Sequence, residues 1–377
     1  MITHSKGIEN IVKKRIAHGS NYHDTLRTTY GADPREVWDV FSKYKKESAE
    51  KIGICNFYPK LPEPHSIYSQ WRMTPKATKV ILQKLLEKDY KKICFLGCPV
   101  LGIEFGKVSP SRPLLLDIDS TILNNAKQSA EILVYDVNNK IPKELIGTFE
   151  CVITDPPWYY QDIKLFIKKA SELAKKGGTV YLSCPSLLTK PSILEERLDL
   201  QKWLSNLNLV FAELNSIVEY EVPPFEYMAY FDIPAFTGKP WRIGDLLKLK
   251  KSDDSSQTVI VDKTCFNWKE YSFGVKRVFL REKEDDTEKP KLSLVRDNSL
   301  TLNTVSRRSP LIPKIDIWTS RNAVLHIDSG FNVIKSILDS LAKGAKEIPP
   351  EISDRYAKKY KKEVTDSIQK LRAIIGL

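Results

Sequence analysis

Short apolar runs alternate with segments of helical spacing between residues 76 and 235 of the chain. This alternation predicts a mainly parallel β-sheet with helices on its faces. Five runs that crossovers separate are expected to form strands: residues 92–96, 113–116, 131–134, 149–154 and 179–183. Two longer runs, 209–222 and 226–233, are joined by so short a link that they predict an antiparallel hairpin. The pattern therefore indicates an α/β fold with five parallel strands and a terminal hairpin.

The segments on either side of this core have other patterns. Asp33-Pro34 and Thr74-Pro75 each place a capping side chain before a proline, which is typical of a helix start. After residue 235, short strand-like runs such as 259–261 alternate with polar breaks, which indicates mainly β structure. The expected division is a helical N-terminal extension (1–75), the sheet domain (76–235), a mainly β region for substrate recognition (236–345) and a basic amphipathic C-terminal helix (346–377).

The ends of the first three expected strands carry candidate ligand-binding residues. Phe95, Gly97 and Pro99 surround the first turn, where glycine lets the backbone approach a ligand. Asp117, at the tip of the second strand, can accept hydrogen bonds from the ribose hydroxyls of a nucleoside. Asp119 is the second choice for this role, and it is also placed to cap the next helix.

The third strand ends at Asp136-Val137. Asp136 can accept from an adenine amino group while Val137 packs against the ring, although an aspartate at this position is equally typical of a turn.

The fourth strand leads into the most informative motif, Asp155-Pro156-Pro157-Trp158, followed by Tyr159 and Tyr160. Two prolines fix the backbone and remove two donors, so that carbonyl oxygens are left to accept hydrogen bonds from an amine. Trp158 offers a flat face on which a base can stack. The motif therefore predicts a site that orients an amino group for attack, with Tyr159 or Tyr160 lining the pocket.

The Asp-Pro-Pro-Trp motif resembles motif IV of amino-methyltransferases that act on adenine in DNA or RNA. With Gly97, Asp117 and Asp136, the resemblance covers about residues 70–235. It implies a Rossmann-type methyltransferase fold and S-adenosylmethionine as the cofactor, with Thr74 in a segment that closes over the methionine end of that cofactor. Pro99 departs from the family, because a second glycine is common there.

A second family resembles the same region. Branched-polyamine synthases, which transfer aminopropyl groups from decarboxylated S-adenosylmethionine, also have a motif that begins Asp-Pro-Pro, with a Leu-Phe pair like Leu165-Phe166 a few residues on. This resemblance implies a polyamine substrate. A third interpretation is a catalytically degenerate methyltransferase fold that serves as a nucleic-acid-binding subunit, which the Pro99 departure favours and the intact motif opposes.

The net charge of the chain favours the interpretations with a nucleic-acid partner. The 377 residues carry a formal net charge of +12, which favours DNA or RNA as the partner over a polycation. The expected phosphate contacts are Lys358, Lys359, Lys361, Lys362 and Arg307-Arg308. The cysteines are scattered without a zinc spacing, and no apolar run has the length of a membrane span. We therefore expect a cytoplasmic enzyme that needs neither metal nor membrane; the sequence indicates no oligomeric state.

Overall fold

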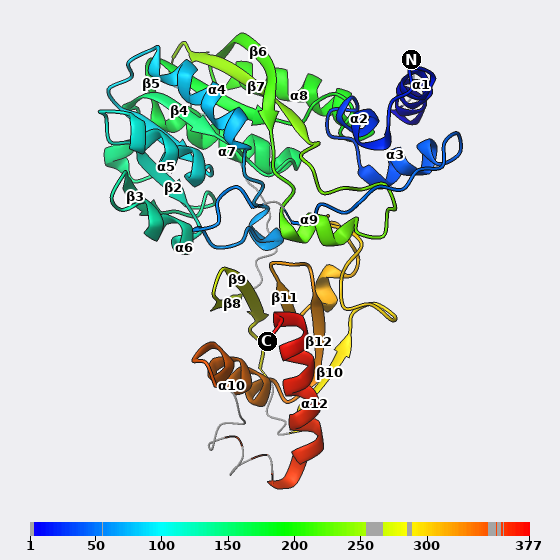
Figure 1. Cartoon of the computed structure of the whole chain (residues 1–377). Helices are drawn as coiled ribbons and strands as arrows, with labels where there is room; N and C mark the ends of the chain where they lie inside the picture. The colour runs from blue at the N-terminus through cyan, green and yellow to red at the C-terminus, as the bar shows by residue number, and fades with distance from the viewer. Residues whose placement is uncertain are drawn as a thin grey trace. The chain divides into compact units, whose positions relative to one another are not determined.

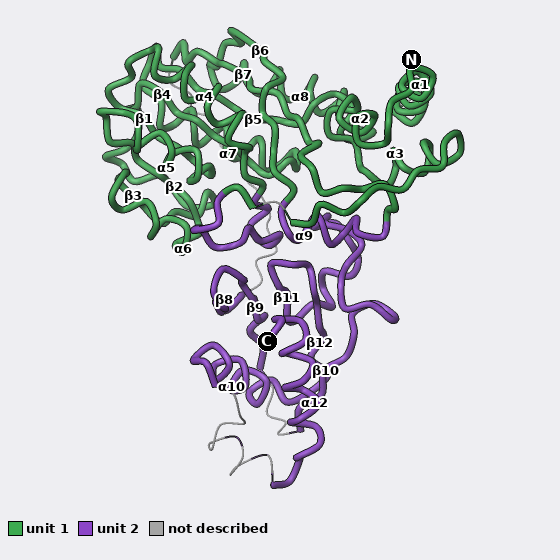
Figure 2. Tube along the Cα trace, viewed as in Figure 1, with its two compact units in different colours: residues 1–57, 71–222, 233–262 green, residues 58–70, 223–232, 263–377 purple. Residues whose placement is uncertain are grey.

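The structure, a computed structural model, describes residues 4–54, 56–253, 267–284, 289–345, 352, 356 and 358–377. The chain divides into two compact units (Figure 2). The first comprises Met1–Phe57, Trp71–Val222 and Ile233–Asp262, and the second comprises Tyr58–Gln70, Pro223–Asp232 and Lys263–Leu377. Each unit therefore combines segments that are far apart in the sequence.

A seven-stranded sheet forms the centre of the first unit, with strand order β3-β2-β1-β4-β5-β7-β6 (Figure 1). The strands are β1 Ile93–Leu96, β2 Leu114–Asp117, β3 Glu131–Val134, β4 Phe149–Thr154, β5 Ala174–Cys184, β6 Leu209–Glu219 and β7 Ile243–Lys251. Strands β1 to β5 pair in parallel, whereas β7 is antiparallel to β5 and β6. This is the arrangement of a Rossmann-type methyltransferase sheet, so the predicted fold class is confirmed.

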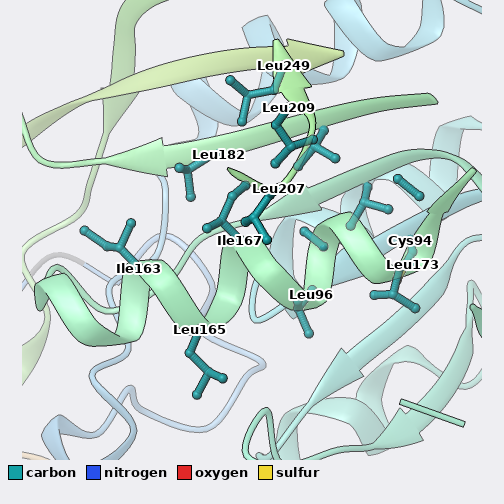
Figure 3. Packing of buried hydrophobic residues seen from close by; sticks show 14 of the residues in the cluster. Cys94, Leu96, Ile163, Leu165, Ile167, Leu173, Leu182, Leu207, Leu209 and Leu249 are labelled. Atoms are coloured by element: carbon teal, nitrogen blue, oxygen red, sulfur yellow. The ribbon is translucent and has the colours of Figure 1, made fainter. Parts of the chain in front are cut away.

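Helices cover both faces of this sheet. One face carries α4 Pro75–Leu86, α5 Pro99–Val108, α6 Ser120–Leu123 and η2 Asn124–Ala126, and the other carries α7 Tyr160–Leu173 and α8 Ile193–Asn206. Figure 3 shows the core on the second face, where Ile163 and Ile167 of α7 pack with Leu96 of β1. Phe95, the neighbour of Leu96, enters the opposite core. The central strands β1 and β4 are buried on both faces, as parallel strands usually are, whereas the edge strands β3 and β6 are partly exposed.

The N-terminal extension is helical, with α1 His4–Ala17, α2 Tyr22–Arg27 and α3 Pro34–Phe41. Asp33 caps α3 by accepting from the Arg35 N–H, and Thr74 caps α4 by accepting from the Ala77 N–H at 3.3 Å. Both helix starts that the sequence predicts are therefore confirmed.

The predicted hairpin was wrong in its second strand. Pro224 stands at the first helical position of α9, Pro224–Ala229, and the antiparallel partner of β6 is instead β7. A proline fixes the backbone in a conformation that suits the first turn of a helix, and here this effect outweighs the apolar run that follows. The domain boundary expected at residue 235 was also wrong, because β7 lies beyond it and completes the first sheet.

The second unit contains a five-stranded sheet with strand order β10-β12-β11-β9-β8, in which all pairs are antiparallel. The strands are β8 Trp268–Phe273, β9 Lys276–Arg281, β10 Lys291–Leu294, β11 Ile317–Thr319 and β12 Val324–Ser329. Helices α10 Phe331–Ala342 and α12 Lys358–Ile375 pack on it. The C-terminal region is thus mainly β and ends in helices, as expected; the run at 259–261 lies outside the described residues.

Helix α12 packs its apolar residues on the second unit and carries exposed lysines before and after a kink at Tyr360. Val364, Ile368 and Leu371 are buried in the core of the second unit. The four lysines at 358, 359, 361 and 362 are exposed. Within the described parts of the chain, no helix is long and apolar enough to cross a membrane. The remaining short helices are η1 Ser66–Tyr68, η3 Lys143–Leu145 and η4 Ile312–Lys314.

Candidate active site

The carboxyl ends of the parallel strands bring most of the predicted residues to one edge of the first sheet. Gly97 follows β1, Asp117 ends β2, Asp136 follows β3, Asp155 follows β4, and Ser183 lies next to the last residue of β5. Open α/β sheets bind ligands at this edge. Burial raises the pKa of the Cys98 thiol, and the nearby charges of Asp155, Cys94 and Asp117 raise it further.

Asp155 accepts two hydrogen bonds on a single carboxylate oxygen. The Ser183 hydroxyl donates to Oδ1 at 2.6 Å, and the Tyr220 hydroxyl donates to the same atom at 2.7 Å. The two hydroxyl oxygens are themselves 2.6 Å apart. No residue in the described part of the chain donates a hydrogen bond to Oδ2. This oxygen is also not completely buried. Asp155 therefore keeps one oxygen for a ligand.

The hydrogen-bond donors around Asp155 are neutral hydroxyls. Among the described residues, no cationic side chain is bonded to it. Burial raises the pKa of the Asp155 carboxyl to about 6, and the hydrogen bonds from Ser183 and Tyr220 oppose this rise. The carboxylate is therefore mostly ionised at neutral pH and still more basic than an ordinary aspartate. A group of this kind can orient an amine and accept its proton.

The rest of the motif forms a tight turn. The Pro157 carbonyl accepts from the Tyr159 N–H at 2.8 Å. The Pro156 carbonyl accepts no hydrogen bond from the described residues. Tyr160 begins α7 and donates its hydroxyl to Asp199 on α8, so its polar end is engaged away from the motif turn.

Trp158 is held by the protein on several sides. Its ring meets Tyr220 edge-on, with 5.5 Å between the ring centroids. A Cβ atom on Gly244 would lie 2.6 Å from Cζ2 of Trp158, so only glycine lets the indole approach β7 this closely. The Arg242 guanidinium carbon lies 5.3 Å from the Trp158 ring centroid. The predicted stacking of Trp158 on a substrate base stays a prediction.

The Thr74 segment lies beside the end of β6. Met73 pairs with Tyr220 in an antiparallel bridge, and the Thr74 N–H donates to the Glu219 carbonyl at 2.9 Å. Thr74 Oγ1 also donates to Glu219 Oε2 at 3.1 Å, while Arg27 binds Glu219 Oε1 at 2.6 Å. The segment that precedes α4 is thus fixed next to the residue that hydrogen-bonds Asp155.

The turn after β1 is closely packed. Gly97 has φ +68°, and a Cβ at this position would lie 2.5 Å from the Phe166 ring on α7. The Gly97 N–H donates to the Leu116 carbonyl, and Pro99 at the start of α5 has no N–H. The Cys98 thiol donates to the Ile153 carbonyl at 3.5 Å. Phe95 is fully buried beneath this turn.

The two candidate ribose aspartates have different surroundings. Asp119 is buried and caps α6 by accepting from the Thr121 and Ile122 N–H groups. Asp117 is half-buried and accepts from the Asp119 N–H at 2.8 Å through Oδ1. The capping role of Asp119 is confirmed, which leaves Asp117 as the stronger candidate for ribose.

Asp136 binds within its own turn, where Oδ1 accepts from the backbone N–H of Asn138 at 2.9 Å and from its side-chain amide at 2.6 Å. Val137 beside it is buried. The turn role is therefore present, and contact with adenine stays a prediction. No group of three or more His, Cys, Asp or Glu side chains suited to a metal ion occurs in the described segments.

Sequence reasoning missed Ser183, Tyr220 and Arg242. Ser183 had a positional signal, because it ends the fifth predicted strand. Tyr220 and Arg242 had none, since their places next to the motif depend on how β6 and β7 pair.

Comparison with known proteins identifies similar chains. A family model for the branched-chain polyamine synthase A C-terminal domain matches residues 102–233, which include Asp155, Ser183 and Tyr220. An uncharacterized protein of Methanocaldococcus jannaschii is 31% identical over 147 residues, 37% of this chain and 34% of that protein. The chain thus spans about a third of the length of this curated relative.

A solved structure shares the fold. The branched-chain polyamine synthase from Thermus thermophilus, in complex with N4-aminopropylspermidine and 5'-methylthioadenosine, matches with a TM-score of 0.51 and 17% identity over 68% of this chain and 97% of that chain. A putative S-adenosylmethionine-dependent methyltransferase from Listeria monocytogenes has a TM-score of 0.33 and 14% identity over 48% of this chain and 100% of that chain.

The sheet order and the residues at its carboxyl edge define a protein with the fold of S-adenosylmethionine-dependent methyltransferases and related transferases. Within that class, residues 102–233 are similar to the C-terminal domain of branched-chain polyamine synthase A.

Proposed function

We propose that this chain is an aminopropyltransferase that alkylates an amine of a polyamine, with decarboxylated S-adenosylmethionine as the donor. The donor supplies a carbon activated by a positively charged sulfur. The acceptor nitrogen forms a bond to that carbon, the electron pair of the broken carbon–sulfur bond stays on sulfur, and the nitrogen loses one proton. Asp155 Oδ2 orients the nitrogen and accepts this proton.

The observation that carries the proposal is the way Asp155 is held. Both hydroxyl donors bind Oδ1, which fixes the carboxylate and leaves Oδ2 for the amine N–H. The Pro156 carbonyl is a second acceptor in the adjacent residue. Two acceptors can hold a nitrogen by its protons while its lone pair faces the donor carbon, and orientation of this kind accounts for much of the rate of a two-substrate reaction.

The turn after β1 favours a donor without a carboxylate. A carboxylate needs N–H groups or a cation, yet the Gly97 N–H is bonded to Leu116 and Pro99 has no N–H. Residues 96–100 contain no charged side chain, and Phe166 covers Gly97. Asp117 at the end of β2 would bind the ribose hydroxyls, which both forms of the donor share.

The local charge is compatible with a polyamine although the whole chain is basic. Asp117 ends β2, and Asp136 and Asp155 follow β3 and β4, so all three lie at the same edge of the sheet. The similarity over residues 102–233 to the polyamine synthase domain supports the same acceptor class.

A donor comparison tests the proposal. Isothermal calorimetry with S-adenosylmethionine and its decarboxylated form should give tighter binding of the decarboxylated form, by about tenfold or more, because the carboxylate would lose its hydration without new partners. Mass spectrometry of spermidine incubated with that donor should then detect an added aminopropyl group. Tighter binding of S-adenosylmethionine, with methylated product, would refute aminopropyl transfer.

Methyl transfer to an adenine amino group of DNA or RNA is the second candidate, with S-adenosylmethionine as the donor. The observation that favours it is a group of exposed lysines at the start of α12, on either side of its kink: Lys358, Lys359, Lys361 and Lys362. Such a surface can neutralise phosphates, although a run of lysines is more often simply solvated.

Filter binding of a labelled oligonucleotide over a salt series tests this candidate. A footprint of about four to six phosphates would lower affinity by roughly 10²–10³ between about 50 and 200 mM salt. Replacing the four lysines with glutamate should flatten that dependence. If the unmodified protein binds no oligonucleotide at the low-salt end, the nucleic-acid function is excluded.

A further inference from the structure

Three tryptophans surround the guanidinium of Arg242. Its carbon lies 4.8 Å from the ring centroid of Trp241, 5.1 Å from that of Trp71 and 5.3 Å from that of Trp158. These distances fall within the range of cation–π attraction, which is strongest for tryptophan. One planar cation therefore contacts the aromatic residue of the motif and two further indoles.

The three indoles come from different parts of the first unit. Trp71 precedes the segment that pairs with β6, Trp158 follows β4, and Trp241 precedes β7. The Arg242 carbonyl accepts from the Tyr220 N–H at 3.0 Å, so Arg242 is also joined to the residue that hydrogen-bonds Asp155. Arg27 donates to the Pro240 carbonyl at 2.8 Å and forms an ion pair with Glu219, which anchors the segment that carries Trp241.

Packing also restricts the position of Trp158. Cβ atoms built on Gly244 and Gly31 would lie 2.6 Å and 3.4 Å from its six-membered ring. Trp241 is fully buried, and among the described residues its indole N–H has no acceptor. Contact between the rings and the guanidinium is thus the main polar interaction that this buried indole makes.

We propose that Arg242 is the positioning residue for Trp158: by stacking among Trp71, Trp158 and Trp241, its guanidinium fixes the aromatic wall of the acceptor site. This inference rests on the proposed transfer function, because it assumes that Trp158 faces the acceptor. Arg242 acts through the indole and leaves binding of the donor unaffected. A planar delocalised cation suits this role better than an ammonium, because it stacks on several rings at once.

Loss of the guanidinium should affect the acceptor alone. In Arg242→Ala, the acceptor KM should rise about tenfold while kcat and the donor dissociation constant each change by less than about twofold. Arg242→Lys keeps the charge and should show a smaller rise, of about threefold. Arg281→Ala is the matched control: Arg281 lies 5.1 Å from the Trp268 ring centroid in the second unit, and its loss should not raise the acceptor KM.

Chemical rescue separates positioning from general packing. Millimolar guanidinium ion should refill the space in Arg242→Ala, lower its acceptor KM toward that of the unmodified protein and change its tryptophan fluorescence in a saturable way. Urea has the same shape without the charge and should do neither. The same additions to Arg281→Ala should leave its acceptor KM unchanged.

The proposal is overturned if Arg242→Ala keeps the original acceptor KM, if urea restores it as well as guanidinium does, or if Arg281→Ala shows the same rise. Should Arg242→Ala fail to fold, Arg242→Lys decides: an unchanged acceptor KM in that folded variant overturns it. If the unmodified protein transfers no group to any amine, the proposed function fails. In that case the fluorescence response to guanidinium still tests the cluster, and its absence overturns the cluster independently.

Discussion

Each unit of the molecule takes a charged side chain out of bulk water, wholly for Arg277 and partly for Asp155, and the two charges have different partners. Arg277 in β9 is fully buried; its Nε and Nη2 donate to the two carboxylate oxygens of Glu270 at 2.7 and 2.9 Å. Gln70 accepts from Nη1, and the Tyr68 and Phe279 rings stack on the guanidinium. Asp155 in the first unit is bonded, among the described residues, only to the neutral hydroxyls of Ser183 and Tyr220.

This difference separates a structural charge from a reactive one. A buried ion with an opposite charge and full hydrogen bonding is held in one state, and removing its partner is strongly destabilising. A carboxylate with neutral donors alone keeps a raised pKa and an unfilled oxygen, so it can respond to a ligand or a proton. The contrast indicates that Glu270 and Arg277 maintain the fold of the second unit, whereas Asp155 is placed for chemistry.

The largest expected effect is on turnover. Asp155→Ala should lower kcat by about 10²–10⁴-fold, the usual contribution of a positioned acid or base, with donor affinity nearly unchanged. Steady-state kinetics and calorimetry measure the two quantities. Ser171→Ala serves as a control, because Ser171 is a buried hydroxyl on α7 that donates to the Leu207 carbonyl. Near-original turnover in Asp155→Ala would remove this residue from the mechanism.

The second effect is on stability. Glu270→Gln should lower the free energy of unfolding by about 3–5 kcal/mol, because the fully buried Arg277 charge loses its counter-ion. Glu363→Gln is the matched control: its pair with Lys289 is exposed to solvent, and its loss should leave the free energy of unfolding nearly unchanged. Urea unfolding of both variants makes the comparison. If both variants lost the same unfolding free energy, the burial of Arg277 would not strengthen its ion pair with Glu270.

The sequence predicts the first unit well where the signals are local. Alternating runs identify β1 to β5, and the caps at Asp33, Thr74 and Asp119 follow from side chains that reach only two or three residues ahead. The same reasoning placed the hairpin wrongly, because an apolar run after Pro223-Pro224 suits a strand as well as the buried helix α9. A periodic pattern alone does not separate these cases when the run is short.

The partners of Asp155 lie beyond local reasoning. Ser183 is 28 residues away along the chain and Tyr220 is 65 residues away. Their contact depends on the pairing of β4 with β5, and on where the chain leaves β6. Arg242 gains its role from the same tertiary arrangement. The motif could therefore be located from the sequence. The side chains that position it, those of Ser183, Tyr220 and Arg242, could not.

A third, smaller effect concerns pH. Asp155 acts as an ionised carboxylate, and its pKa is raised to about 6, so kcat/KM should fall as the pH drops through about 6. Tyr220→Phe removes one hydrogen bond that stabilises the ionised form, which should move this acid limb upward by about one pH unit. Ser183→Ala should move it in the same direction. A pH–rate profile that stays in place in both variants would disconnect these hydroxyls from the titrating group.

The smallest effect tests whether ionised Asp155 costs the fold stability. The pKa of Asp155 is raised from 3.8 in the unfolded chain to about 6 in the folded protein, so the folded state holds its proton more tightly. Well below pH 4 both states are protonated and no stability is lost. Between about pH 4 and 6 the unfolded chain ionises while folded Asp155 keeps its proton, so stability falls across this window and the loss is complete above about pH 6. In Asp155→Asn the amide carries no charge, and its oxygen could still accept from both hydroxyls. This variant should therefore be more stable than the original by about 1–2 kcal/mol at pH 8, and the difference should vanish near pH 4.

Thermal unfolding at the two pH values measures this difference in stability, with Glu363→Gln as the exposed control. A loss of stability at pH 8 would mean that the Asp155 carboxylate is compensated as fully as Arg277, and the contrast between the two regions would not hold.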